Sequence, residues 1–303
     1  MAKLIIAAGT GFLGKVLIDH FSKTFDEIVI LTRGETKSGG NVQFITWDAK
    51  TLSGWEKALE NADVLINLAG KSVDCRYTES NKREILASRI DSTQILNEAV
   101  LQCVNPPKHW LNSSTSTIYR HSEDKQMTEA GGEIGDDFSM NVAKAWEKAF
   151  FETETPLTLK TALRTSIVLG KEGGAFVPLK KLARLGFGGK QGSGDQFISW
   201  IHETDFARAI GFTIAHEITG VVNIVSPQPI RNKHFMEALR KSLGVKAGIP
   251  IGKQLLEFGA KIIGTETELV LKSRNVIPER LLQHGFHFEF GNIAKALENL
   301  NSK

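Results

Sequence analysis

The segment Gly9-Thr10-Gly11-Phe12-Leu13-Gly14 constrains the fold of this chain more than any other feature. It follows the apolar run Leu4–Ala8 and opens the helical stretch Leu13–Phe21, so its glycines stand between a strand and a helix. Glycine permits the tight turn and lets backbone N–H groups approach a pyrophosphate at the helix N-terminus. The motif predicts a dinucleotide-binding loop. The alternative is a glycine turn of the same fold that holds no ligand.

Short apolar runs alternate with helical stretches over the first two thirds of the chain. Continuous apolar runs suit strands that are buried on both faces of a parallel sheet. The alternation predicts an α/β fold, a Rossmann doubly wound parallel sheet with right-handed crossovers. The expected strands are Leu4–Ala8, Ile28–Thr32, Val42–Thr46, Val64–Leu68, Trp110–Asn112 and Thr161–Leu169, and the expected helices are Leu13–Phe21, Ser88–Val104 and Phe138–Phe151.

The composition and the pattern of apolar residues change after residue 170. Residues 170–200 are rich in glycine, which indicates loops around a site or a flexible connector. Residues 232–303 read mainly as helix, with apolar side chains at helical spacing. We therefore expect a nucleotide-binding domain of residues 1–170 plus a strand near 219–226. Residues 171–218 and 227–303 are expected to form a smaller, mainly helical C-terminal lobe on the substrate side.

Composition argues against several other classes of protein. The net charge is only +3, which does not favour a nucleic-acid partner. Cys75 and Cys103 are too few for a disulfide framework, and no Cys/His spacing typical of a metal site occurs. Neither a signal peptide nor an apolar membrane span is recognisable. We expect a cytoplasmic protein without metal, nucleic acid or membrane partner. The sequence specifies no oligomeric interface, although a homodimer is the commonest assembly.

The residue that ends the second expected strand indicates which dinucleotide is bound. NAD-binding proteins usually place Asp or Glu there, to hold the ribose 2′-hydroxyl. This chain has Thr32-Arg33-Gly34 instead. An acidic side chain would repel a 2′-phosphate, whereas arginine pairs with it bidentately. Arg33 therefore predicts NADP(H) as the cofactor, and the alternative is a solvated surface arginine.

Asn67-Leu68-Ala69-Gly70 resembles the N-x-A-G element of the short-chain dehydrogenase/reductase superfamily. The chain is similar to one atypical or extended branch of it, the NAD(P)-binding "epimerase family", which is sugar-nucleotide epimerase-like and has a small C-terminal domain. The resemblance covers nearly the whole chain. The matching residues are Gly9–Gly14, Trp47-Asp48, Asn67–Gly70, Ser88-Arg89, Trp146-Glu147, Leu163-Arg164, Gly173-Gly174, Gly192–Gly194, Trp200–His202, Asp205, Val225–Pro227, Arg231-Asn232, Pro278, Arg280-Leu281 and Gly285-Phe286.

The resemblance implies cofactor contacts beyond the glycine loop. Glu84 and Arg89 match positions that reach the cofactor from a helix, although they could instead form a surface ion pair. Ile167 would pack near the nicotinamide, unless it is a plain core residue. One departure is Ala8, where the family usually has glycine. The full set of expected cofactor contacts is Gly9, Thr10, Gly11, Phe12, Leu13, Gly14, Thr32, Arg33, Leu68, Ala69, Gly70, Glu84, Arg89 and Ile167.

Typical members of the superfamily use a Tyr-x-x-x-Lys pair, in which the lysine lowers the tyrosine pKa for acid–base work. This chain has two tyrosines, Tyr77 and Tyr119, and neither has a lysine four residues later. The resemblance places Ser139 and Ala143 near the tyrosine and lysine positions. The usual pair is therefore absent.

The hydroxyl element of such sites survives in part. Ser114 or Thr115 would supply a hydroxyl to a substrate carbonyl, and the alternative is a polar strand end that caps the next segment. Two functions remain open. The first is an NADP-dependent oxidoreductase or epimerase-like enzyme for an unidentified small molecule. The second, favoured by the missing pair, is a non-catalytic NADP(H)-binding redox sensor or interaction protein.

Overall fold

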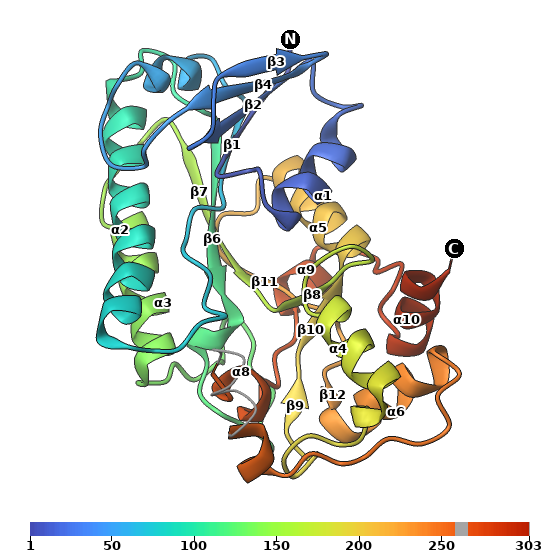
Figure 1. The fold of residues 1–303 in the computed structure, drawn as a ribbon. Coiled ribbons are helices and arrows are strands. Elements are labelled where there is room, and N and C mark those ends of the chain that lie inside the picture. The colour runs from blue at the N-terminus through green and yellow to red at the C-terminus, as the bar shows by residue number, and fades with distance from the viewer. Residues whose placement is uncertain (258–265, 303) are drawn as a thin grey trace.

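The computed structural model describes residues 1–257 and 266–302, within which one central sheet dominates (Figure 1). Its strand order is β11-β7-β6-β5-β1-β2-β4-β3, and all neighbouring strands are parallel except β3 and β4. The chain order reverses between β1 and β5, the switch point where this fold binds nucleotides. The strands are β1 (Lys3–Ala7), β2 (Glu27–Thr32), β3 (Lys37–Gly39), β4 (Val42–Thr46), β5 (Val64–Asn67), β6 (His109–Thr115), β7 (Leu159–Thr165) and β11 (Gly220–Ile224).

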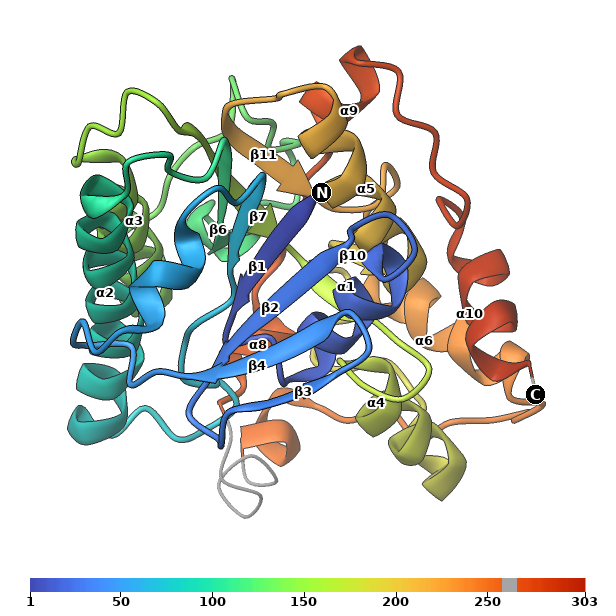
Figure 2. The same ribbon diagram turned by 90° about the horizontal axis from the view of Figure 1, so that it is seen from above.

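Helices cover both faces of this sheet, as Figures 1 and 2 show. On one face lie α1 (Phe12–Phe21) and α5 (Glu203–Ala215), and on the other α2 (Glu79–Gln102) and α3 (Phe138–Phe151). Side chains alternate between the two cores because successive strand residues point to opposite faces. Leu4 and Ile6 of β1 join the first core, and Ile5 and Ala7 join the second. The predicted doubly wound sheet is confirmed.

A third hydrophobic core lies in the C-terminal half, where Phe176, Trp200 and Phe235 pack together. Its helices confirm the expected helical lobe, although residues 258–265 and 303 of the expected range lie outside the described part of the chain. No described helix is both long and apolar enough to cross a membrane. The remaining elements are β8 (Ile167–Leu169), α4 (Phe176–Leu182), β9 (Phe197–Ile198), β10 (Trp200–His202), β12 (Ile230–Arg231), α6 (Asn232–Ser242), α8 (Glu268–Leu271), α9 (Glu279–Gln283), α10 (Ile293–Asn301) and the short helical turns η1 (Trp55–Leu59), η2 (Ser116–Ile118) and η3 (Ala183–Phe187).

Three predicted elements were wrong in their bounds. The expected strand 110–112 is longer, since β6 runs from His109 to Thr115. The expected strand 161–169 is two strands, because the chain leaves the main sheet at Ser166 and β8 pairs with β10 in a separate sheet. The expected helix 88–104 begins at Glu79, where the Thr78 side chain caps it by accepting a hydrogen bond from Asn81 N. Residues 79–87 are mostly polar, so apolar periodicity does not reveal the first turns. The division into domains at residue 170 stays a prediction.

Because two histidines are buried, we expect the folded chain to lose stability in acid. Burial lowers the pKa of both His109 and His202 to about 4, against an ordinary 6.5. Below pH 6.5 the unfolded chain therefore binds protons that the folded chain excludes, so stability is lost as pH falls from 6.5 to 4. At 1.36 kcal/mol per pH unit, each histidine accounts for about 3 kcal/mol at pH 4.

Urea unfolding of wild type and His109→Asn at pH 7 and pH 4.5 tests this expectation. His109 accepts replacement best because only its Nε2 is partnered, 2.7 Å from Thr161 Oγ1, while Nδ1 is buried without a partner. The variant should lose markedly less stability than wild type between the two pH values. An equal loss in both proteins would contradict the assignment.

Candidate functional site

The glycine loop joins β1 to α1 and leaves the helix N-terminus open. Gly11 is the N-cap residue, and no side chain caps it. The first N–H groups of α1 are therefore free to bind an external anion. A Cβ at Gly14 would lie 2.0 Å from the Gly9 carbonyl oxygen, so Gly14 is required for close packing of the loop on the helix. A Cβ at Gly11 would meet no atom within 4 Å, so nothing in the chain itself requires glycine there.

Phe12, the first residue of α1, is held by a second glycine-rich turn. A Cβ at Gly170 would lie 2.2 Å from the Phe12 ring, and one at Gly173 would lie 2.3 Å from it. At Gly174, which has φ +64, a Cβ would lie 2.1 Å from the Val168 carbonyl oxygen. The glycines at the start of segment 170–200 thus let the chain pass close to the phosphate loop, rather than make a flexible connector.

Ala8 occupies a backbone conformation that favours glycine, with φ +58. An L-residue in this left-handed region destabilises the folded chain by about 1–2 kcal/mol. Glycine relieves that strain, but because it is more flexible than alanine in the unfolded chain, its folding costs about 0.4–1 kcal/mol more in conformational entropy. The difference predicts that Ala8→Gly raises the free energy of unfolding by about 0.5–1 kcal/mol. Urea denaturation would measure it, and a variant less stable than wild type would refute the strain argument.

Arg33 follows the carboxyl end of β2 and is exposed. It forms no ion pair with any described residue. Thr32 is buried, and its Oγ1 accepts a hydrogen bond from Gly34 N at 3.1 Å. The turn after β2 is therefore fixed by Thr32, while the Arg33 guanidinium stays available to a ligand at the same edge as the glycine loop.

The N-x-A-G element is shaped by its asparagine. Asn67 is fully buried; its Nδ2 donates to Asn112 Oδ1 at 2.7 Å, and its Oδ1 accepts from Ala69 N at 3.0 Å. These bonds fix the turn of residues 67–70 at the carboxyl end of β5. Leu68 and Gly70 line the pocket described next, whereas Ala69 is buried beneath it.

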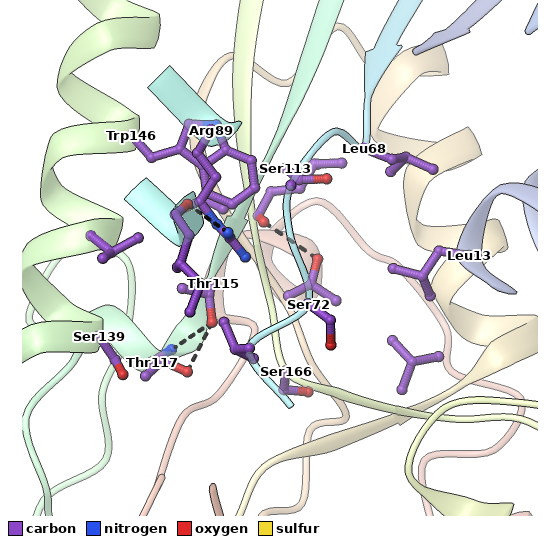
Figure 3. A pocket seen from close by; sticks show the side chains of 18 of the residues that line it. Leu13, Leu68, Ser72, Arg89, Ser113, Thr115, Thr117, Ser139, Trp146 and Ser166 are labelled. Atoms are coloured by element: carbon purple, nitrogen blue, oxygen red, sulfur yellow. Dashed lines mark hydrogen bonds between the residues drawn. The ribbon is translucent and has the colours of Figure 1, made fainter. Parts of the chain in front are cut away.

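A pocket of about 500 Å³ lies at the carboxyl ends of the parallel strands (Figure 3). Phe12 and Leu13 form the wall beside the glycine loop. Hydroxyl groups gather elsewhere in the lining, contributed by the strand ends, by the loop after β5 and by the start of α3. These residues are Ser72, Tyr77, Ser113, Ser114, Thr115, Thr117, Ser139, Thr165 and Ser166. The pocket therefore runs from an anion-binding helix terminus to a wall rich in hydrogen-bonding groups.

Arg89 brings a positive charge into this pocket from α2 (Figure 3). Its Nη1 donates to the Lys71 and Ile85 carbonyl oxygens at 3.0 and 2.9 Å, and its guanidinium lies 5.0 Å from the Trp146 ring centroid. Burial lowers the pKa of Arg89 to about 10, so the group remains charged at neutral pH. Glu84 lies outside the lining, where its carboxylate binds Lys71 Nζ at 2.6 Å.

Ser114 belongs to a buried hydrogen-bond network. Its Oγ donates to Glu147 Oε1 at 2.6 Å, and Glu147 also pairs bidentately with Arg164 at 2.8 and 2.7 Å. Arg164 Nη1 donates to the Tyr119 hydroxyl, which in turn donates to Asn223 Oδ1. Burial opposes the charge on Arg164, but Glu147 more than offsets it and raises the arginine pKa. The network fixes Ser114 at the pocket wall.

Thr115 and the start of α3 complete that wall. Thr115 Oγ1 accepts a hydrogen bond from Thr117 N at 3.1 Å, so this side chain caps η2. This agrees with the alternative given from the sequence, a polar strand end that caps the next segment. Its role toward a substrate, like that of Ser114, stays a prediction. Ser139 faces the pocket from the first turn of α3, whereas Ala143 is fully buried one turn further along. The position that the resemblance places near the superfamily's tyrosine thus carries a small hydroxyl, and the one it places near the lysine carries a core alanine.

The structure gathers part of the predicted site into one pocket. Seven expected residues line it: Phe12, Leu13, Leu68, Gly70, Arg89, Ser114 and Thr115. Ile167, in β8, is not in the lining. Sequence reasoning missed Tyr77 and Ser72, because nothing in the polar loop 71–78 indicates that it folds back over the strand ends. No group of three or more potential metal ligands occurs among the described residues.

Comparisons with known proteins agree with this geometry. The model described as "NAD dependent epimerase/dehydratase family" matches residues 4–137, and a "Domain of unknown function" matches residues 257–300. Epimerase family protein SAR0825 of Staphylococcus aureus is 33% identical over the whole of both chains. The human epimerase family protein SDR39U1 is 31% identical over 98% of this chain and 99% of its own.

Solved structures show the same likeness. The crystal structure of human SDR39U1 (isoform 2) with NADPH has a TM-score of 0.86 and 30% identity, covering 98% of each chain. The nucleoside-diphosphate sugar epimerase from Corynebacterium glutamicum has a TM-score of 0.78 and 26% identity over 98% of this chain and 58% of that one. Fold and site define a dinucleotide-binding protein of the Rossmann type. The chain belongs to the NAD dependent epimerase/dehydratase family, which confirms the resemblance stated from its motifs.

Proposed function

We propose that this chain is an NADP(H)-dependent oxidoreductase that acts on a small carbonyl or hydroxyl compound. The observation that carries the proposal is the pocket, which joins the open N-terminus of α1 to a wall of hydroxyl groups. A bound NADPH would place its pyrophosphate at Gly9–Gly14 and its 2′-phosphate at Arg33. The cofactor supplies hydride chemistry, so the chain needs only to orient a substrate and handle a proton.

NADP(H) rather than NAD(H) is supported by two observations. Arg33 is exposed at the end of β2 and forms no ion pair within the described residues. The human relative with 30% identity was crystallised with NADPH. The glycine loop suits the pyrophosphate of the dinucleotide. The packing of the chain itself does not require glycine at position 11, so close approach of a ligand to the backbone accounts for it.

The competing function is that of a redox sensor that binds NADP(H) without turnover. The absent Tyr-x-x-x-Lys pair favours it. A sensor, however, has no need of a pocket beyond its cofactor site, and here Thr115 and Ser139 extend the lining on the side opposite Leu13 of the glycine loop (Figure 3). That extension favours an enzyme.

Loss of NADPH absorbance at 340 nm in the presence of carbonyl compounds and nucleotide sugars tests the proposal. We expect turnover of at least one class of compound by wild type. Gly11→Ala serves as the matched control, because it should fold normally but bind the cofactor at least about 100-fold more weakly, and it reveals non-enzymatic oxidation. Tight NADPH binding without turnover of any compound would reject the enzyme in favour of the sensor.

A further inference from the structure

Tyr77 lines the pocket beside the start of α3, where the resemblance places the superfamily's missing tyrosine. The loop 71–78 carries it over the strand ends, and its side chain forms part of the lining. The Tyr77 ring packs against Phe138, the residue before Ser139, and the Ser139 hydroxyl is a close polar neighbour of the phenol. Ser139 is the residue that the resemblance places near the tyrosine position. A loop, rather than α3, therefore contributes the phenol side chain to this part of the pocket.

Contacts from three directions hold Tyr77 in place. Its backbone N donates to Glu266 Oε1 at 2.8 Å, and its ring meets the edge of Phe138 with centroids 4.9 Å apart. The same loop is tied to α2, where Asn81 Nδ2 donates to the Arg76 carbonyl oxygen at 2.7 Å. The C-terminal segment, α2 and α3 thus position one side chain, and a group fixed in this way is preorganised for chemistry.

Among the residues that the structure describes, no other phenol and no ammonium group lines the pocket. Tyr119, the second tyrosine of the chain, is buried, and its hydroxyl donates to Asn223 Oδ1 and accepts from Arg164 Nη1. Among the described residues that line the pocket there is no lysine. The charged groups that act on Tyr77 are Glu266, Glu268 and Arg274 of the C-terminal segment and Arg89 of α2, together with the Cys75 thiol.

The protonation state of Tyr77 favours one direction of transfer. Burial raises the pKa of the Tyr77 phenol, the nearby Ser139 hydroxyl opposes that change, and the acidic neighbours add to it. The net direction is upward, so the hydroxyl keeps its proton at neutral pH. Such a group donates a proton to a developing alkoxide more readily than it removes one from an alcohol.

We propose that Tyr77 is the general acid of carbonyl reduction in this pocket, an inference that rests on the proposed function. A substrate carbonyl carbon would accept a hydride from the reduced nicotinamide, and the carbonyl oxygen would accept the Tyr77 proton as the phenol O–H bond breaks. The carbonyl becomes an alcohol, the nicotinamide is oxidised, and the phenolate regains a proton from water. The Arg89 guanidinium, which pairs with no described carboxylate, stabilises the phenolate through its charge.

Tyr77→Phe tests this role, because it removes the hydroxyl and keeps the ring on Phe138. With a compound turned over by wild type, kcat should fall at least about 100-fold, the lower range of general acid catalysis. The dissociation constant for NADPH and the unfolding midpoint should stay unchanged. Turnover within about threefold of wild type would overturn the role of Tyr77 while leaving the proposed function intact. Failure of wild type to turn over any compound would overturn both.

A second readout needs no turnover. With ¹³Cζ-labelled tyrosine the chain gives two NMR signals, and Tyr77→Phe identifies the one from Tyr77. The Tyr77 signal should remain that of a protonated phenol up to the ordinary pKa of 10.0, and it should shift in Ser139→Ala. A signal that ionises below about pH 9, or that ignores Ser139→Ala, would overturn the proposed proton donor.

Discussion

Gly11→Ala is expected to weaken NADPH binding at least about 100-fold, or roughly 2.7 kcal/mol, without destabilising the folded chain. The Gly11 backbone, with φ −80 and ψ −176, is extended and accessible to any residue. Its added Cβ would meet no protein atom within 4 Å. The remaining physical reason for glycine is the approach of a pyrophosphate to the backbone, and a methyl group would obstruct it.

Gly14→Ala provides the matched control, because it should destabilise the folded chain, whereas Gly11→Ala should not. Its Cβ would lie 2.0 Å from the Gly9 carbonyl oxygen and 2.3 Å from the carbonyl carbon, so the loop or the helix must move. We expect a loss of about 3 kcal/mol or more in the free energy of unfolding. Thermal unfolding and isothermal titration calorimetry on both variants separate the two effects. Normal NADPH binding by Gly11→Ala would contradict the placement of the pyrophosphate.

Arg33→Ala should weaken NADPH binding by about 1.5–3 kcal/mol, roughly 10- to 100-fold, and leave NADH binding unchanged. The reason is that only NADPH carries the 2′-phosphate with which a guanidinium forms charge-assisted hydrogen bonds. Arg33→Glu should weaken NADPH further, since a carboxylate repels the phosphate. Fluorescence titration of each variant with both cofactors measures the effect.

Lys37→Ala is the matched control for Arg33. Lys37 is an exposed base on β3, four residues away, and its ammonium lies 4.9 Å from the Phe44 ring centroid. Removing it changes the net charge by the same amount as Arg33→Ala but takes away no expected phosphate contact. If both variants lose NADPH affinity equally, the effect is a general one of charge, and Arg33 does not read the 2′-phosphate.

Local sequence was sufficient wherever a strand and its loop are neighbours in the chain. The apolar run 4–8 and the glycines after it defined β1 and the start of α1 to within a residue. The same holds for Thr32-Arg33 at the end of β2, because a buried strand followed by a polar turn needs no distant partner. The parallel order of the sheet then followed from the handedness of the crossovers.

Contacts between distant segments could not be predicted in this way. Ser114 is fixed by Glu147, 33 residues later, and the loop with Tyr77 is fixed by Glu266, 189 residues later. Neither pairing leaves a periodic or spacing signal in the sequence. The break at Ser166 was hidden for a related reason, since apolar residues occur on both sides of the polar stretch 164–166 while the neighbouring strands change from β6 and β11 to β10.

Calorimetric titration of the wild-type chain with NADPH and with NADH tests the central claim most directly. NADPH should bind at least about tenfold more tightly than NADH, because the 2′-phosphate gains at least one charge-assisted contact from Arg33. Equal affinity for the two cofactors would contradict an NADP(H) site at the end of β2.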